Sequence, residues 1–535
     1  MYVISDLHLH SRFSRAVSPQ MTIDGIADWA GKKGIGLVAT GDWTHPMWMR
    51  EIGEKLEEDG SGLLKQKEED GRQKTEKIDP SHDIAEVARP NSGVLRSLAD
   101  ARAPSAKNSN LSALPATGRS TPLFLLSTEI SCIYSQGGKT RRVHVLVWVP
   151  TIASAQKISQ ELTKRGCNLM SDGRPIIGMS LINLSELILT VEPQALIVPA
   201  HIWTPWFSVY GKMGGFESLE EAFGEFAKNI YAVETGLSSS PDMNWRIKEL
   251  DSRAIVSFSD AHSGPKLGRE ATIFELPEIT YKNIKRALES PTHAAVANEN
   301  LDASSVPNSS SPSAPSLRGS EAAQNFIRSP LACRIEYTIE FYPEEGKYHY
   351  TGHRMCNVRL TPEEVSSKGT TCSMCGKPLT QGVMQRVEEL AESTRVNNET
   401  IEQLNNGDAT YGLDKDIRLL QSRITLSRPP FVMLVPLQEI IAEAIGSPVA
   451  SPKTQAQYTM LVSRFNGEFN VLLHASIDEI GSVSTKEIAD GIRKVRTGDI
   501  VVDPGYDGVF GVVKIWKSKE EKALVDRSKE QLGLF

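Results

Sequence analysis

Short apolar runs alternate with amphipathic segments along the first 300 residues of the chain. The segment after Thr22 carries Ile23 and Ile26 at helical spacing, and Thr22 can cap the helix that they predict. The runs that read as strands lie at residues 1–4, 35–39, 123–126, 143–149, 195–198, 230–233 and 254–258. Repeated alternation of strand and helix predicts an α/β fold with a parallel sheet.

Residues that bind metals follow these apolar runs repeatedly. Because residues i and i+2 of an extended strand point to the same face, the pairs His8/His10 and Asp260/His262 each direct two donors at one spot. The full set of candidate metal ligands is His8, His10, Asp42, His45, Glu129, His144, His201, Asp260 and His262. In a β/α barrel the residues at strand ends meet at one rim, so this pattern predicts a multinuclear metal site there.

The types of ligand indicate the chemistry of this site. Imidazole and carboxylate together suit transition metals such as zinc, manganese or iron better than calcium. The set is larger than one ion needs, so we expect two to three divalent ions, with zinc, manganese and magnesium as candidates. Such a cluster holds a phosphate ester and deprotonates a bound water near neutral pH. We expect Glu129, Asp260 and His262 to act most directly in catalysis. The alternative interpretation is that these histidines are structural, which is the more common role of a single histidine at a strand end.

Two segments interrupt the alternation of strand and helix. Residues 58–121 pass from a charged run into Ser/Pro/Ala/Asn-rich sequence, which predicts a flexible insertion, and residues 303–320 read as a Ser/Pro-rich linker. The expected organisation is a barrel over residues 1–300, a linker over 301–325, a cysteine-bearing module over 330–382 and a mixed, mainly helical C-terminal domain over 383–535. In that last domain, residues 437–445 and 484–495 read as helices and residues 470–473 as a strand.

Three of the six cysteines cluster in the sequence. The pairs His353-x2-Cys356 and Cys372-x2-Cys375 are separated by 15 residues, which is the pattern of a structural zinc site. In so small a module the metal would supply much of the folding free energy. His349 is an alternative fourth ligand, and two unrelated pairs are the alternative interpretation. The remaining cysteines are expected to be buried, small apolar residues: Cys132, Cys167 and Cys333.

Charge and composition narrow the function classes. The net charge of −7 does not favour binding of nucleic acid by the protein as a whole. A net charge does not reveal a local basic groove. No apolar stretch approaches the roughly 20 residues of a membrane span, and the N-terminus lacks the pattern of a signal peptide. We therefore expect a cytoplasmic protein without a membrane partner. Residues 137–140 (Gly-Gly-Lys-Thr) lack the first glycine of an ATP-binding P-loop, so ATP-driven helicase activity is not expected.

Five segments carry a family resemblance. They are Asp6-Leu7-His8-Leu9-His10-Ser11, the strand with Glu129, His144, Pro199-Ala200-His201 and Ser259-Asp260-Ala261-His262-Ser263. These segments resemble the PHP (polymerase and histidinol phosphatase) superfamily of metal-dependent phosphoesterases. The resemblance implies a distorted (β/α)7 barrel, usually with three metals. It further implies the ligand sets of each ion: His8, His10, Glu129 and Asp260 for the first, the bridging Glu129 with His144 and His201 for the second, and His262 with Asp42 or His45 for the third.

Longer segments narrow the resemblance. Residues 41–48, 201–207, 234–239, 346–354 and 503–508 are similar to the endonuclease Q family of DNA-repair nucleases. The resemblance covers nearly the whole chain outside the insertion and the linker. It implies cleavage of the phosphodiester 5′ to deaminated bases (uracil, hypoxanthine, xanthine) and at abasic sites, with 3′-hydroxyl and 5′-phosphate products. It also implies damaged DNA as a partner, a sliding clamp as a further partner, and a nucleoid-associated location.

Aromatic residues after His201 suit the recognition of a base. An enzyme that reads one damaged base takes it out of the helical stack, and aromatic side chains can line the receiving pocket. The candidates are Trp203, Trp206, Phe207 and Tyr210, with Arg12 and Lys212 as candidate phosphate contacts. The alternatives are that the aromatics pack the barrel rim and that the basic residues are solvated surface. Competing functions are a phosphatase acting on a small phosphomonoester and a nucleic-acid-binding protein without catalysis.

Overall fold

The computed structural model describes residues 1–68, 121–289, 332–394, 401–403, 413–423, 425 and 427–518. Most of the predicted insertion at 58–121 therefore lies outside the described residues. The predicted linker at 301–325 lies outside them entirely.

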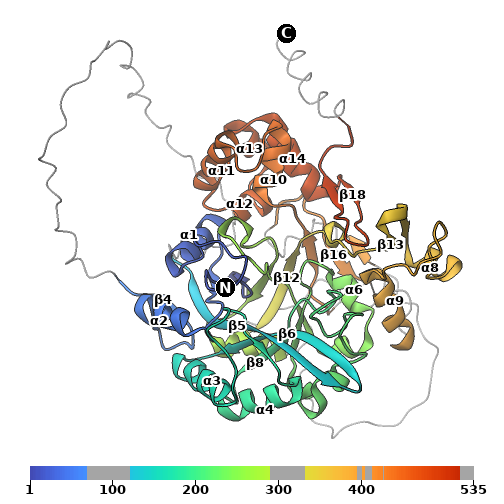
Figure 1. Ribbon diagram of the computed structural model, residues 1–535. Coiled ribbons are helices and arrows are strands. Elements are labelled where there is room, and N and C mark those ends of the chain that lie inside the picture. The colour runs from blue at the N-terminus through green and yellow to red at the C-terminus, as the bar shows by residue number, and fades with distance from the viewer. Residues whose placement is uncertain are drawn as a thin grey trace, which may run out of the picture.

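A ring of strands forms the centre of the molecule (Figure 1). Its members are β1 (Tyr2–Asp6), β2 (Leu37–Ala39), β5 (Leu123–Gln136), β6 (Lys139–Val149), β8 (Leu196–Pro199), β9 (Ala232–Glu234) and β10 (Ala254–Val256). β1, β2 and β5 pair in parallel, as do β9 and β10. A hydrogen bond from Ile202 N to Glu234 O joins the end of β8 to β9, and a bridge between Leu9 and Ala261 closes the ring. The predicted α/β fold is confirmed.

The hairpin of β5 and β6 departs from the expected parallel arrangement. The two strands pair antiparallel from Leu126 opposite Val149 to Gln136 opposite Lys139, and β6 also pairs antiparallel with β8. Gly137 and Gly138 join them with φ of 59° and 73°, and a two-residue turn of this kind reverses the chain directly. Glu129 consequently lies within a long strand, whereas the sequence pattern predicted that it follows a strand end; His144 lies on a strand, as predicted.

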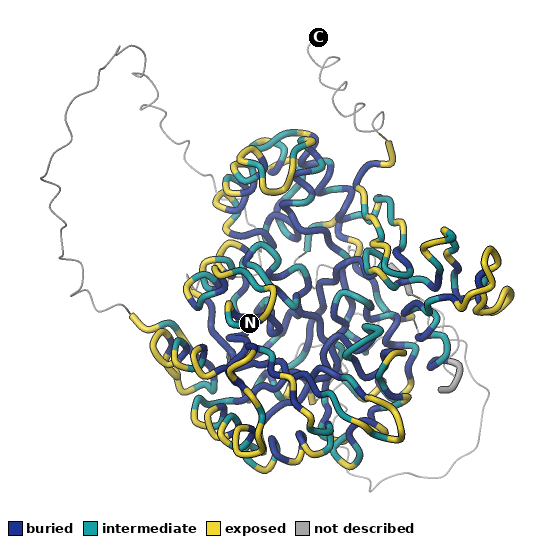
Figure 2. The backbone as a smooth tube through the Cα atoms, viewed as in Figure 1, coloured by how far each residue is buried: buried dark blue, intermediate teal, exposed yellow. Residues whose placement is uncertain are grey.

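Two apolar layers cover the faces of the ring. Leu123 and Leu125 of β5 belong to one buried cluster, and Phe124 and Leu126 belong to the other, as expected for side chains that alternate along a strand. The second layer is completed by helices around the ring, and Figure 2 shows that burial is concentrated between these elements. The helices of this layer are α1 (Ile23–Lys33), α2 (Pro46–Lys55), α3 (Ile152–Lys164) and α4 (Leu181–Val191), whereas the buried residues of α7 (Tyr281–Glu289) belong to the first cluster. Thr22 caps α1 by accepting from Gly25 N at 3.0 Å, which confirms the predicted helix start.

The sheet continues from β1 into the second half of the chain. β11 (Ala271–Glu275) pairs antiparallel with β1, and β12 (Arg334–Glu340) pairs antiparallel with β11. β12 then pairs with β17 (Phe431–Met433), beyond which lie β16 (Leu419–Ser422) and β15 (Ile401–Gln403). The chain after the predicted linker is therefore built into the same sheet as the barrel strands.

A small cysteine-bearing region projects from this body (Figure 1). It contains β13 (Thr351–His353), β14 (Val358–Leu360) and α8 (Pro362–Lys368), and α9 (Val383–Thr394) returns to the barrel. Its buried apolar cluster is small, with Leu360, Val365, Cys372 and Leu379. Among the other cysteines, Cys132 is buried as expected, whereas Cys167 and Cys333 are only partly buried.

Helices of the C-terminal region stack on the barrel beside α1 (Figure 1). They are α10 (Leu437–Ile445), α11 (Pro452–Phe465), α12 (Glu468–Leu473), α13 (Ile477–Val483) and α14 (Lys486–Thr497), followed by the strands β18 (Val501–Asp503) and β19 (Val512–Lys514). The predicted helices at 437–445 and 484–495 are confirmed. The predicted strand at 470–473 is wrong because this segment belongs to α12, and its run of three apolar residues fits either structure when it is buried.

A buried ion pair fastens this region to the barrel. Lys33 Nζ of α1 lies 2.7 Å from Glu468 Oε2 of α12, and the two side chains are only 2% and 4% exposed. Tyr458 of α11 donates to the same carboxylate at 2.8 Å. Removing one member of such a pair typically costs about 3 to 5 kcal/mol, because the other charge is then left buried without a partner. This loss is on the order of the net free energy of unfolding of a small domain.

The remaining elements are short. They are β3 (Leu56–Glu58), β4 (Leu64–Gln66), β7 (Ile176–Ile177), α5 (Leu219–Phe223), α6 (Pro241–Trp245) and 3-10 turns at Gly224–Asn229, Lys248–Ser252, Gly264–Lys266, Pro343–Glu345 and Arg354–Cys356. Among the described helices, none has the length and apolar character needed to cross a membrane.

Candidate metal centre

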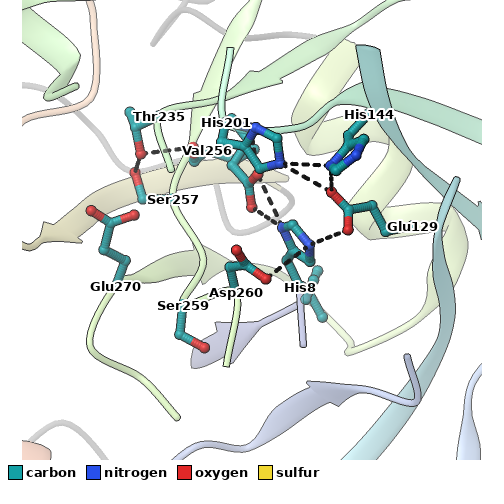
Figure 3. A network of polar contacts seen from close by, with 12 residues as sticks. His8, Glu129, His144, His201, Thr235, Val256, Ser257, Ser259, Asp260 and Glu270 are labelled. Atoms are coloured by element: carbon teal, nitrogen blue, oxygen red, sulfur yellow. Dashed lines mark hydrogen bonds and ion pairs between the residues drawn. The ribbon is translucent and has the colours of Figure 1, made fainter. Parts of the chain in front are cut away.

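The first histidine pair faces two carboxylates at one rim of the ring. His10 Nε2 lies 3.2 Å from Glu129 Oε2 and 3.2 Å from Asp260 Oδ1. His8 Nε2 lies 3.8 Å and 3.6 Å from the same two oxygens. Figure 3 shows the His8 ring between the carboxylates of Glu129 and Asp260. The extended chain that follows β1 therefore directs both imidazoles of the pair at one point.

Glu129 lies between two pairs of histidines. Its Oε2 faces His8 and His10, while its Oε1 lies 2.7 Å from His144 Nδ1 and 3.0 Å from His201 Nε2 (Figure 3). A carboxylate with one oxygen toward each pair has the arrangement of a ligand that bridges two cations.

Three overlapping groups could each hold a metal ion. Within a group, all donor atoms lie within 4.8 Å of one another. The groups are His8 with His10 and Glu129, His10 with Asp260 and His262, and Glu129 with His144 and His201. The geometry of this rim fits a cluster of cations that share Glu129 and His10.

Asp42 and His45 lie outside these groups. The carboxylate of Asp42 accepts from Ser11 N at 2.6 Å, Ser11 Oγ at 2.7 Å and Ser14 Oγ at 2.9 Å, and it contacts His10 Nδ1 at 3.0 Å. Its lone pairs are therefore used within the protein, and its contact with His10 orients that ring. His45 precedes α2 and stacks on Phe13 with ring centroids 4.6 Å apart.

Buried atoms without partners test whether cations fit here. His8 Nε2, His10 Nε2 and Asp260 Oδ1 have no hydrogen-bond partner among the residues that the structure describes. An unsatisfied buried polar atom costs about 1 to 3 kcal/mol, so three of them side by side indicate that something else binds there. Imidazole nitrogens and carboxylate oxygens are suitable donors for zinc, manganese or iron. The residues present fit a divalent cation.

The charges of the site lead to the same conclusion. Burial alone would lower the pKa of His8, but the surrounding carboxylates, Glu234 first, outweigh it and raise that pKa well above its ordinary value. Burial likewise opposes ionisation of Glu129, yet His144 and Arg174 hold the pKa of Glu129 well below its ordinary value. The rim thus concentrates negative charge on oxygen atoms that protons or metal cations must neutralise.

Three of these residues have unusual backbone conformations. Asp42, His201 and Asp260 have φ of 47°, 30° and 46°, in the left-handed region that side chains other than glycine rarely adopt. Such conformations cost free energy and persist only where the surrounding structure holds them in place. They are found most often at functional sites. Each of the three stands where the chain leaves a barrel strand and turns across the rim.

Two contacting residues were missed in the sequence. Glu234 ends β9, and its Oε1 lies 2.8 Å from His8 Nδ1 while its Oε2 accepts from His201 N at 2.8 Å. The position of Glu234 directly after an apolar run was the sequence signal that could have identified it as part of the site. Arg174 donates to Glu129 Oε2 at 3.0 Å from the loop between α3 and β7, where no periodicity marks it.

A cavity of about 540 Å³ opens beside the candidate metal ligands. His144, His201 and Asp260 line one part of it, and Tyr348 and His349, from the segment before β13, line another. The cavity therefore lies between the barrel and the cysteine-bearing region. Its basic lining residues are Arg15, Arg174 and Lys347.

The predicted base-binding aromatics divide into two pairs. Trp206 and Phe207 line the cavity, and the Trp206 ring meets Tyr348 edge to face at 5.0 Å. Trp203 and Tyr210 are fully buried and donate to Asn244 at 2.7 Å and to Glu249 at 2.6 Å, which gives them a packing role.

The predicted phosphate contacts both pair with carboxylates elsewhere. Arg12 lies 2.7 Å from Glu51, and Lys212 lies 3.1 Å from Glu389.

The second candidate metal site lies in the cysteine-bearing region. The donor atoms of His353, Cys356, Cys372 and Cys375 all lie within 4.8 Å of one another. Burial opposes ionisation of the Cys372 thiol, but hydrogen bonds from the backbone of Met374 and Cys375 and from the side chains of His353 and Cys375 together lower its pKa to about 6, which favours the thiolate that metals bind. His349 is absent from this group and lines the cavity instead.

Comparison with known proteins gives matches along different parts of the chain. The model of the MJ0043 C-terminal domain family matches residues 436–499, which span α10 to α14. The uncharacterized protein MJ0043 of Methanocaldococcus jannaschii is 26% identical over 326 residues, which are 60% of this chain and 32% of that protein. The chain thus spans about a third of the length of that relative. The uncharacterized protein YqxK of Bacillus subtilis is 28% identical over 398 residues, 74% of this chain and 79% of that protein.

Solved structures match nearly the whole chain. The lesion-specific endonuclease PfuEndoQ from Pyrococcus furiosus superposes with a TM-score of 0.66 at 25% identity, over 97% of this chain and 98% of that one. Endonuclease Q in complex with a 27-mer duplex that carries an abasic lesion at the active site gives a TM-score of 0.65 at 26% identity, over 97% and 99% of the two chains. The chain is similar to endonuclease Q from the barrel through the C-terminal helices.

Proposed function

We propose that this protein is a metal-dependent DNA-repair endonuclease. It cuts the phosphodiester 5′ to deaminated bases and at abasic sites, and it leaves 3′-hydroxyl and 5′-phosphate ends. The observation that carries the proposal is a cavity lined by the candidate metal ligands His144, His201 and Asp260, in a chain similar to a lesion-specific endonuclease over 97% of its length. We assign the barrel to the PHP superfamily of phosphoesterases on the ligand-bearing segments of the sequence.

The carboxylates and imidazoles of the rim would hold the catalytic cations. His8, His10 and Asp260 would hold one, His144 and His201 a second, and Glu129 would bridge the two, with His262 available to a third. When bound, divalent cations supply Lewis acidity and a water of lowered pKa for phosphoester hydrolysis. Asp42 and Glu234 keep the rings of His10 and His8 in the orientation that binding needs.

The cavity supplies the surroundings that a phosphodiester requires. Arg174 already contacts the bridging Glu129 and lines the cavity, so its remaining N–H groups are available to a phosphate oxygen. Arg15 and Lys347 add positive charge along the same wall. Trp206, Phe207 and Tyr348 offer aromatic surface to an extruded nucleotide, and 540 Å³ is enough room for one.

The cysteine-bearing region would bind one structural zinc ion through His353, Cys356, Cys372 and Cys375. Its apolar cluster is small, so the metal would fix the fold of β13 and β14. Because Tyr348 and His349 immediately precede β13, this zinc would also hold one wall of the cavity in position.

Incision of a defined lesion tests the proposal. Wild type and an Asp260→Ala variant are incubated with Mn²⁺ or Mg²⁺ and an end-labelled duplex that carries a single uracil. Wild type is expected to nick immediately 5′ of the uracil and the variant is not. Release of phosphate from a small phosphomonoester without nicking, or DNA binding without either reaction, would replace the proposal with a phosphatase or a non-catalytic binding protein.

A further inference from the structure

His349 lies on the wall of the cavity and has no role in either candidate metal site. Its side chain is absent from every group of possible metal ligands among the described residues, and the residue is only 5% exposed. Its Nδ1 atom is buried and makes no hydrogen bond within the described structure. A buried polar atom without a partner beside a ligand cavity indicates a contact that forms only with the ligand.

The backbone around His349 is held rigidly. His349 O accepts from Met384 N at 3.1 Å at the start of α9. Gly382 approaches so closely that an added Cβ would come within 2.6 Å of His349 O. The ring also packs against Tyr350 with centroids 5.0 Å apart. A side chain fixed in this way can distinguish one ligand from another by the position of a single hydrogen bond.

The protonation state of His349 determines what its ring can offer. Burial lowers the pKa of this imidazole to about 4, against a hydrogen bond to the backbone of Pro343, so the ring is neutral near pH 7. A neutral imidazole has one N–H and one lone pair. The carbonyl of Pro343 can only accept, so it takes the N–H and leaves the lone pair for the ligand.

Deamination changes the hydrogen-bonding character of a base at one ring nitrogen. Cytosine N3 and adenine N1 carry lone pairs, whereas the corresponding nitrogens of uracil and hypoxanthine carry a proton. An acceptor at the right place in the cavity would pair with the deaminated base and repel its parent. Rejection is strong in such a site because the wrong base leaves buried polar groups unpaired.

We propose that His349 is a specificity-determining residue that accepts a hydrogen bond from the protonated ring nitrogen of an extruded deaminated base. The inference rests on the proposed endonuclease function and accounts for the discrimination of uracil from cytosine and of hypoxanthine from adenine; thymine and guanine carry the same N–H, so this contact does not exclude them. Abasic sites have no base to read, so their incision does not depend on His349.

Three duplexes that differ in one position test this role. The first duplex carries uracil, the second hypoxanthine and the third an abasic site. The His349→Phe variant keeps an aromatic ring at this position but removes the hydrogen-bond acceptor. The variant is expected to lose about 10- to 100-fold in kcat/KM on uracil and hypoxanthine, the effect of one unpaired buried group. Abasic incision is expected to stay close to wild type, which also shows that the variant folds. A His349→Gln variant, which restores an acceptor through its amide oxygen, is expected to recover part of the loss.

The outcomes separate this inference from the function on which it rests. Equal losses on all three duplexes, or no loss on any, would overturn the role of His349 while leaving the endonuclease in place. If wild type cuts none of the duplexes, the proposed function fails and the inference with it. If both variants fail to fold, wild type is tested on N3-methyluracil, which lacks the N–H. Cleavage as fast as that of uracil would then contradict the inference.

Discussion

Glu234 and His8 meet at 2.8 Å beneath the metal-binding rim, oxygen Oε1 against nitrogen Nδ1. The other oxygen of Glu234 accepts from the backbone N–H of His201 at 2.8 Å. One fully buried carboxylate thus orients ligands that come from two different strands. Carboxylates behind metal-bound histidines fix the ring and increase its basicity, and their loss typically costs 10- to 100-fold in affinity or activity.

Replacement of Glu234 by glutamine should therefore weaken metal binding. The amide keeps the shape of the side chain but removes its charge, so the His8 ring loses its anionic partner. We expect metal affinity to fall by about 10- to 100-fold, as measured by titration of the metal-free protein and by incision at limiting Mn²⁺. An unchanged titration curve would show that the contact does not matter for binding.

Asp260 and His262 belong to a ligand group with His10, whereas His45 does not. A His262→Ala variant should bind fewer cations per chain than wild type, because it removes one donor of that group. A His45→Ala variant is the matched control and should retain the full metal content, since His45 stacks on Phe13 outside the groups. Metal analysis of the dialysed proteins compares the two. Equal metal loss in both variants would place His45 among the ligands.

Cys372→Ser should remove one zinc ion per chain without affecting the barrel cations. The thiol of Cys372 is the group whose pKa falls to about 6 in the cluster, and a serine hydroxyl does not ionise there to bind zinc. We expect weaker binding of the lesion duplex as well, because Tyr348 and His349, which line one wall of the cavity, lie just before β13. Zinc content is measured by elemental analysis, and a value equal to wild type would contradict the assignment.

The stability of the protein should depend on pH through Glu340. This fully buried carboxyl accepts hydrogen bonds from Ser257 at 2.5 Å and from Thr338, yet burial raises its pKa to about 7. Since the unfolded chain titrates near 4.5, the folded state binds the extra proton between these values. Its contribution to stability is complete below about pH 4.5 and is lost as the pH rises through 7.

A Glu340→Gln variant tests this pH dependence. The amide mimics the protonated carboxyl, so the variant should gain about 1 to 3 kcal/mol over wild type at pH 8 and little at pH 5. Urea unfolding at both pH values measures the difference. Parallel stability curves for the two proteins would indicate that Glu340 titrates normally.

Much of the candidate metal centre is predictable from the sequence because paired donors on extended chain must share a face. The pairs His8/His10 and Asp260/His262 illustrate this, and the α/β alternation predicts the fold that brings them together. The position of Glu129 within a strand was missed, since β5 continues far beyond its apolar run before Gly137 and Gly138 reverse the chain. Arg174 could not be found, because a loop residue reaches its partner through tertiary packing alone. The same packing decides that residues 470–473 are helical.

The ion pair between Lys33 and Glu468 bears on how this protein can be divided. Glu468 lies within residues 436–499, the part that a family model matches as a unit of its own. Its partner, however, lies in the first helix of the barrel, so each part carries the counter-charge for the other. Dividing the chain between them would leave Lys33 on one part and Glu468 on the other, each without its partner. Co-expression of the two parts as separate chains is therefore expected to keep both charges paired, whereas truncation leaves one of them without its partner.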